Sequence, residues 1–159
     1  MRGNPPVLAK TKNILVLNGP NLNMLGVRQP EVYGSDTLQD IAKACAAKGK
    51  ALGLGVDFRQ SNIEGELVTW IQQARGRDAG IVINPAAYGH TSIALLDALT
   101  LAELPVIEVH LSNIHRREPF RHSTYISQIA TGVICGLGAQ GYLLALEAMA
   151  NLVTPKKAR

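Results

Sequence analysis

Residues 80–110 read GIVINPAAYGHTSIALLDALTLAELPVIEVH. The two ends of this stretch, residues 80–84 and 105–110, are short apolar runs rich in isoleucine and valine, which is typical of strands. Between them, residues 91–101 carry apolar side chains at the spacing of one helix face. A strand, a helix and a second strand in this order predict a βαβ unit, whose two strands run parallel.

The same alternation continues on both sides of this unit. Further strands are expected at residues 14–17, 55–60 and 132–135, and further helices at residues 37–50, 64–75 and 139–152. Five such strands predict a small doubly wound α/β domain, a parallel sheet with right-handed crossovers and helices on both faces. Ligands bind such sheets outside the carboxyl ends of the strands, so the loops that follow the strands are expected to carry function.

The composition fits one globular domain. The chain has 159 residues, of which 47% are apolar and 18% charged, enough for a single core. We expect a flexible N-terminal extension over residues 1–12, one catalytic domain over residues 13–153 and a basic tail over residues 154–159. No stretch is apolar and long enough for a signal peptide or a membrane span, so a cytoplasmic location is expected.

The positive charge lies mainly at the two ends of the chain. The formal net charge is +4, but six of the sixteen basic residues lie in the tails, and residues 13–153 hold ten basic against twelve acidic residues, a net charge of −2. The folded body is therefore not basic, which argues against nucleic-acid binding. Cys45 and Cys135 are far apart and have no zinc-like spacing, so both are interpreted as reduced core thiols.

The loop after residues 105–110 holds the densest group of reactive side chains. It offers an imidazole at His110, a hydroxyl at Ser112, and guanidinium groups at Arg116, Arg117 and Arg121, which together suit an anionic, hydroxylated ligand. Glu108 and His110 are two residues apart on a strand and share one face, where a carboxylate favours the protonated, acidic form of the imidazole. The plain alternative is a solvated, charged turn.

Two other loops offer polar groups to the same edge of the sheet. The long segment 18–34 holds Arg28 and Tyr33, and an arginine near a tyrosine favours the phenolate form. The alternative is a flexible loop with surface side chains. After residues 80–84, Asn84 can donate to a ligand oxygen and His90 can orient a neighbour, although a histidine at a helix start is often only a cap. Asp97 makes either a surface salt bridge or a contact across a subunit boundary.

Several classes of function lack their motif. The chain has neither a Gly-x-Gly-x-x-Gly segment after a strand nor a Walker motif, which argues against dinucleotide and nucleoside triphosphate binding. Its carboxylates and histidines are not grouped at ligand spacing, so no metal site is expected. No lysine lies in an apolar strand, which argues against a Schiff base.

The loop motifs closely resemble those of the type II 3-dehydroquinate dehydratases, or 3-dehydroquinases, over about residues 13–152. The matching segments are Leu17-Asn-Gly-Pro-Asn-Leu-Asn-Met-Leu-Gly26, Arg28, Tyr33-Gly34, Gln60-Ser-Asn-Ile-Glu-Gly-Glu66, Ile83-Asn-Pro-Ala-Ala-Tyr88, His90-Thr-Ser92, Glu108-Val-His-Leu-Ser-Asn-Ile-His115, Arg117-Glu118, Phe120-Arg-His-Ser123 and Ile134-Cys-Gly-Leu-Gly-Ala-Gln-Gly-Tyr142. The resemblance implies a flavodoxin-like domain, trimers gathered into dodecamers, and reversible dehydration of 3-dehydroquinate to 3-dehydroshikimate without a cofactor or metal. The shikimate and quinate pathways both use this reaction.

The resemblance also implies the catalytic roles. Tyr33 as phenolate would remove the proton next to the ketone, with Arg28 favouring its ionised form. Asn21, through a bound water, would stabilise the enolate that results. His110, kept charged and oriented by Glu108, would then protonate the departing hydroxyl, so that water leaves anti to the proton.

The same resemblance implies how substrate is held. The substrate carboxylate would lie on Asn84, the Ser112 hydroxyl and the backbone N–H groups of Leu111 and Ser112. The ring hydroxyls would lie on His90 and Arg121. Asp97 would arrive from a neighbouring subunit, and Arg117 is interpreted as a loop organiser, like His115 and His122.

The chain departs from the family pattern at Gly89, where threonine is usual, which leaves the rigidity of His90 open. Two other functions are alternatives to this one. A flavodoxin-like binding or signalling module is disfavoured, because neither a flavin-binding loop nor a receiver-type acidic cluster is present. A catalytically silent relative is disfavoured because every proposed catalytic position carries a competent side chain.

Overall fold

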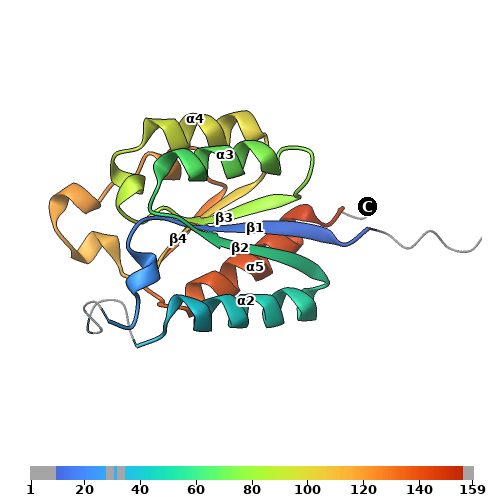
Figure 1. The fold of residues 1–159 in the computed structure, drawn as a ribbon, viewed down its shortest axis with the longest axis horizontal. Helices are drawn as coiled ribbons and strands as arrows, with labels where there is room; N and C mark the ends of the chain where they lie inside the picture. Colours follow the sequence, from blue (N-terminus) through green and yellow to red (C-terminus); the bar gives the residue numbers. More distant parts are fainter. Residues whose placement is uncertain (1–9, 28–30, 32–34, 156–159) are drawn as a thin grey trace, which may run out of the picture.

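A computed structural model describes residues 10–27, 31 and 35–155, and it contains one sheet of five strands (Figure 1). The strands are β1 (Lys12–Asn18), β2 (Leu54–Gln60), β3 (Gly80–Asn84), β4 (Val106–His110) and β5 (Gly132–Cys135). Their order is β2-β1-β3-β4-β5, and all neighbours pair in parallel. This is the doubly wound, flavodoxin-like order, so the predicted fold class is confirmed.

Four helices of the described part of the chain cover the sheet in two layers. Helices α3 (Glu64–Ala74) and α4 (Ile93–Ala102) pack on one face, and helices α2 (Leu38–Leu52) and α5 (Gln140–Val153) on the other (Figure 1). The central strands are apolar on both faces, so each face forms a hydrophobic core with its helix layer. In β1, Ile14 and Val16 are fully buried in the core with α2 and α5, and Leu15 and Leu17 are fully buried in the core with α3 and α4. Burial on both sides is what a parallel sheet between helix layers requires.

Each of these helices begins and ends within two residues of its predicted range. Capping interactions determine where helices α2 and α4 begin. Thr37 caps α2 in a capping box with Asp40, and Gly53 ends the helix in the left-handed conformation at φ 72°. Helix α4 begins at Ile93, not at Thr91, because the side chain of Ser92 accepts from the Leu95 N–H at 2.9 Å and acts as the N-cap. Strand β4 begins after Pro105, which has no N–H to give to a sheet.

One detail of the predicted core is wrong. Cys45 is fully buried, and its burial raises the pKa of the thiol to about 12. Cys135 is only half-buried, because β5 is an edge strand with one neighbour. Both thiols are free.

Among the described residues, no helix is both long and apolar enough to cross a membrane. The predicted tails fall largely on residues 1–9 and 156–159, outside the described residues.

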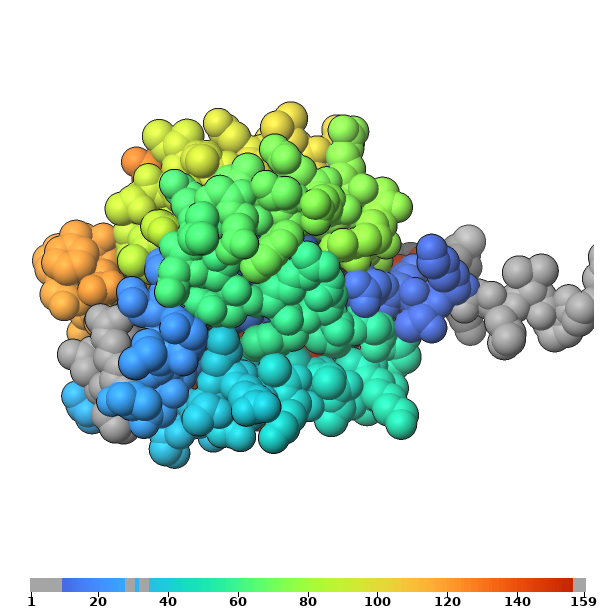
Figure 2. Space-filling view, in the orientation of Figure 1, coloured from blue at the N-terminus to red at the C-terminus, as the bar shows by residue number. Residues whose placement is uncertain are grey.

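The strand order places the functional loops together. The order reverses between β1 and β3, which makes their carboxyl ends the switch point of the fold. In Figure 2, the segment after β1 (blue) and the loop after β4 (orange) lie at the same end of the molecule, opposite the start of β1.

Candidate active site

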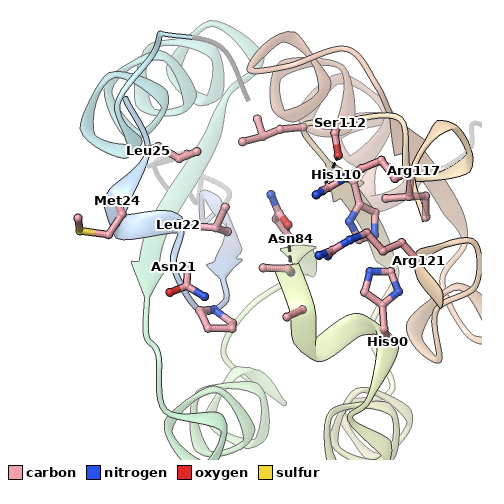
Figure 3. A pocket seen from close by; sticks show the side chains of 15 residues that line it. Asn21, Leu22, Met24, Leu25, Asn84, His90, His110, Ser112, Arg117 and Arg121 are labelled. Carbon is pink, nitrogen blue, oxygen red and sulfur yellow. Dashed lines mark hydrogen bonds between the residues drawn. The ribbon is translucent and has the colours of Figure 1, made fainter. Parts of the chain in front are cut away.

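A pocket opens at the carboxyl ends of β1, β3 and β4. Figure 3 shows Asn21, Leu22 and Met24 on one side of it and His110, Ser112, Arg117 and Arg121 on the other. The side chain of Asn84 lies between these two sides. The pocket is therefore polar and cationic on the β4 side and partly apolar on the β1 side.

The segment after β1 supplies Asn21 and the apolar wall. Asn21 adopts the left-handed conformation at φ 68°, which asparagine tolerates better than most residues. Its backbone N–H donates to Asn62 Oδ1 at 3.0 Å, which ties the segment to the end of β2. Leu22 and Leu25 are buried and face the pocket.

The last residue of β3 is Asn84, and the segment after it supplies His90. Asn84 is 2% exposed, and its Oδ1 accepts from the Ala86 N–H at 3.2 Å. Ala86 itself lies at φ 51°, a conformation that alanine adopts at a cost in free energy. His90 Nδ1 pairs with the carbonyl of Ser123 at 2.9 Å, and its ring stacks at 6.2 Å from the His110 ring.

Gly89 does not loosen His90. The glycine is buried, its carbonyl accepts from the Tyr125 N–H at 2.9 Å, and an added Cβ would lie 2.8 Å from Pro85 Cγ. In this structure the turn is packed closely and leaves little room for a Cβ at this position. The contact with the Ser123 carbonyl fixes one nitrogen of the His90 ring.

Strand β4 carries a carboxylate and an imidazole in contact at its end. Glu108 is fully buried, His110 is 5% exposed, and His110 Nε2 lies 2.7 Å from Glu108 Oε1. Thr124 Oγ1 donates to the other carboxylate oxygen at 3.0 Å, so both oxygens of Glu108 have donors. The imidazole is thereby fixed on one side, which leaves Nδ1 to exchange a proton with a ligand.

The loop after β4 brings two arginines to the pocket. Arg121 Nε donates to Glu118 Oε2 at 2.9 Å, and Arg117 Nη1 donates to Ser112 Oγ at 3.4 Å. The pKa of the Glu118 carboxyl lies below its usual value, first because of its own backbone N–H and further because of Arg121 and Arg117. Each guanidinium has five donors, so both can bind an anion as well.

Most of the predicted site residues meet in this pocket. Those that line it are Asn21, Asn84, His90, His110, Leu111, Ser112 and Arg121, and Glu108 lies directly behind His110. Asp97 is exposed on α4 and does not line the pocket. Arg28 and Tyr33 lie outside the described residues. No group of three or more His, Cys, Asp or Glu side chains suited to a metal occurs in the described part of the chain.

Two histidines of the loop after β4, His115 and His122, lie away from the pocket. His115 and His122 are exposed, their rings lie 6.2 Å apart, and His122 Nε2 pairs with the Arg117 carbonyl at 2.8 Å. Neither lines the pocket. Arg116, a predicted ligand group, is exposed and also does not line the pocket.

Sequence reasoning missed three polar residues that support this site. Thr124 holds Glu108, while Asn18 and Tyr142 form a buried chain of hydrogen bonds behind Asn84. Tyr142 ends one of the matching segments, and this was its only signal. A hydroxyl on an otherwise apolar helix is easily taken for core packing.

Thr124→Val is expected to lower the free energy of unfolding by about 1–3 kcal/mol, because a buried carboxylate oxygen loses its donor at nearly unchanged side-chain volume. Denaturant unfolding measures this. Thr69→Val is the matched control, since the Thr69 hydroxyl donates to Gly65 O on the exposed surface of α3. Equal losses in the two variants would contradict the role of Thr124.

The arrangement supports acid–base chemistry on an anionic ligand. A buried carboxylate and imidazole pair faces a pocket with two arginines, a serine hydroxyl and an asparagine amide. Such a pair can deliver a proton to a leaving oxygen, and the donors around it can hold a carboxylate and hydroxyl groups.

The chain is similar to known enzymes of one family. The family model "Dehydroquinase class II" matches residues 12–150. The chain is 62% identical to the "3-dehydroquinate dehydratase 2" of Pseudomonas putida, over 91% of this chain and 97% of that protein. It is 60% identical to the 3-dehydroquinate dehydratase of Streptomyces coelicolor, over 92% and 94%. The crystal structure of a type II dehydroquinase from Propionibacterium acnes superposes with a TM-score of 0.86 at 49% identity, covering 89% of this chain and 97% of that one.

Proposed function

Because the chain belongs to the class II dehydroquinase family and is thus a hydro-lyase, we propose that it converts 3-dehydroquinate to 3-dehydroshikimate by anti elimination through an enolate. The observation that carries the proposal is the buried Glu108–His110 pair, 2.7 Å apart, facing a pocket with arginine, serine and asparagine donors.

In the first step, a base removes the proton from the carbon next to the ketone, and the electron pair moves to the ketone oxygen as an enolate. We assign the base to Tyr33 as phenolate, with Arg28 favouring that form; both assignments rest on the sequence resemblance. Asn21 lies at the β1 side of the pocket and would stabilise the enolate through a water.

In the second step, the enolate re-forms the ketone, the new double bond is made, and the C–O bond to the hydroxyl breaks. His110 gives its proton to the departing oxygen, so that water leaves, and Glu108 stabilises the imidazolium until then. A subsequent transfer of the proton from Tyr33 to His110 through solvent would restore the starting state.

Substrate binding follows from the remaining groups. The substrate carboxylate would lie on Asn84, Ser112 and the backbone N–H of Leu111 and Ser112, and the ring hydroxyls on His90 and Arg121, all of which line the pocket. Arg117 would organise the loop through its bond to Ser112.

The assembly is part of the proposal. Asp97 lies on the exposed side of α4, where Ile93 and Leu101 are 56% and 63% exposed. We propose that this side meets another copy of the chain, in trimers that form a dodecamer, and that Asp97 thereby reaches the neighbour's site. The proposed location is the cytoplasm, and the pathway is the biosynthesis of aromatic compounds or the breakdown of quinate.

Ultraviolet spectroscopy with 3-dehydroquinate tests the proposal. The purified chain should produce the absorbance of a conjugated enone, since dehydration places the new double bond beside the ketone. The rate should be the same with and without a metal chelator, because the proposed steps use only side chains. Absence of the absorbance change would reject the function, and loss of the rate with chelator would reject the metal-free mechanism.

A further inference from the structure

The hydroxyl of Tyr142 lies deep in the core beneath the pocket. Tyr142 comes from α5, is fully buried in the same apolar core as Leu146, and its ring centroid lies 6.3 Å from that of Phe58. Its ring is buried among apolar side chains, as a phenylalanine ring would be. A hydroxyl in such surroundings costs free energy unless it is hydrogen-bonded, so the bonds that it makes indicate why it is there.

This hydroxyl joins the last residues of two neighbouring strands. Asn84 Nδ2 donates to the Tyr142 oxygen at 2.8 Å, and the Tyr142 hydroxyl donates to Asn18 Oδ1 at 2.7 Å. Asn18 and Asn84 are register partners of β1 and β3, and the Gly19 N–H donates to the Asn84 carbonyl at 2.9 Å. The three side chains therefore meet at the switch point of the sheet.

The direction of each bond is fixed by its neighbours. Asn18 Nδ2 donates to the Arg59 carbonyl at 3.0 Å, so Asn18 presents its oxygen to Tyr142. The hydroxyl must then give its only proton to Asn18 and accept from Asn84. Burial raises the pKa of the Tyr142 phenol, which keeps that proton in place.

The chain of bonds also fixes the amide of Asn84. Its oxygen faces the Ala86 N–H at 3.2 Å and its nitrogen faces Tyr142, so the two ends of the amide cannot exchange places without breaking both bonds. An amide nitrogen carries two hydrogens, and Tyr142 takes one. Figure 3 shows this nitrogen directed between Leu22 and His110, into the pocket that Asn84 lines.

We propose that Tyr142 is a positioning residue whose hydroxyl orients the Asn84 amide, so that an N–H group faces an anionic ligand in the pocket. That this ligand is the carboxylate of 3-dehydroquinate rests on the proposed function. Tyr142 itself does not touch the ligand. Its hydroxyl acts on binding only through Asn84.

Tyr142→Phe in the full chain tests this proposal, because it keeps the ring and removes the hydroxyl. We expect KM for 3-dehydroquinate to rise about tenfold and kcat to stay within about twofold, since binding of the carboxylate is common to the ground state and the transition state. Tyr125→Phe, at a tyrosine that does not line the pocket, should leave both constants unchanged. An unchanged KM in Tyr142→Phe would overturn the proposal.

A double-mutant cycle separates positioning from general packing. If Tyr142 acts through Asn84, adding Tyr142→Phe to Asn84→Ala should change KM by less than twofold. A further tenfold rise in that background would overturn the proposal, because it would show an effect that does not pass through Asn84.

Crystal structures of the wild-type and Tyr142→Phe chains give a readout that does not need activity. The Asn84 amide should be rotated or present in two orientations in the variant, and an unchanged single orientation would overturn the proposal. If the wild-type chain dehydrates no 3-dehydroquinate, the proposed function fails, while these structures still decide whether Tyr142 orients Asn84.

Discussion

Replacing His110 by glutamine is expected to lower kcat by about a thousandfold, the range in which general acids contribute. A glutamine amide can still donate to Glu108, which keeps the buried carboxylate partnered at the 2.7 Å contact that the imidazole now makes. The amide cannot release a proton to the departing hydroxyl. Initial rates of enone formation measure the loss, and KM should change only a few-fold.

Two variants make this result specific. His115→Gln is the matched control, because His115 is exposed and does not line the pocket, and its activity should equal that of the wild type. Glu108→Gln should lose less than His110→Gln, about 10- to 100-fold, since the acid remains but loses the charge that stabilises it. A His110→Gln variant with more than a tenth of the wild-type kcat would contradict the assignment of the acid.

Tyr33→Phe is expected to reduce turnover at least a thousandfold, because the phenylalanine ring has no oxygen to take the proton next to the ketone. The enone absorbance measures it. The size of the assembly, measured by light scattering, should stay that of the wild type, since the change removes one oxygen atom. Full activity in this variant would refute Tyr33 as the base.

Hydrogen exchange in D2O separates the two predicted losses. The His110→Gln variant retains the base, so it should still replace the proton next to the ketone of 3-dehydroquinate by deuterium, as followed by NMR. Tyr33→Phe should not. The opposite pattern, exchange in Tyr33→Phe but not in His110→Gln, would mean that the roles of base and acid are reversed.

The sheet and half of the site could be predicted because their signals are local. Apolar runs such as residues 80–84 mark buried parallel strands, and the spacing of Glu108 and His110 places both side chains on one face of β4. The carboxyl ends of the strands then identify the loops that carry the ligands. Ser112 and Arg121 followed from that rule and from the resemblance, and Leu111 followed from the resemblance alone.

The features that could not be predicted from the sequence depend on contacts between segments that are distant in the chain. Tyr142 reaches Asn18 across 124 positions of sequence, and Thr124 reaches Glu108 in β4 across 16 positions from the loop that follows the strand, so no local pattern signals either bond. The left-handed backbone of Ala86 has no signal at all, since alanine does not favour it. The half-buried Cys135 depends on which strand lies at the edge, which is a property of the whole sheet.

The contacts at the end of β1 also protect Asn18 against deamidation. Asn18 precedes Gly19, and in such a pair the glycine nitrogen can attack the asparagine side chain to form a succinimide, which hydrolyses to aspartate or isoaspartate. Here the Gly19 N–H is held by the Asn84 carbonyl at 2.9 Å, and the Asn18 side chain is fully buried between Tyr142 and Arg59. Neither the attacking nitrogen nor the amide is free to turn toward the other. The bonds that orient the pocket thus also preserve the covalent chain, and this protection ends when the protein unfolds.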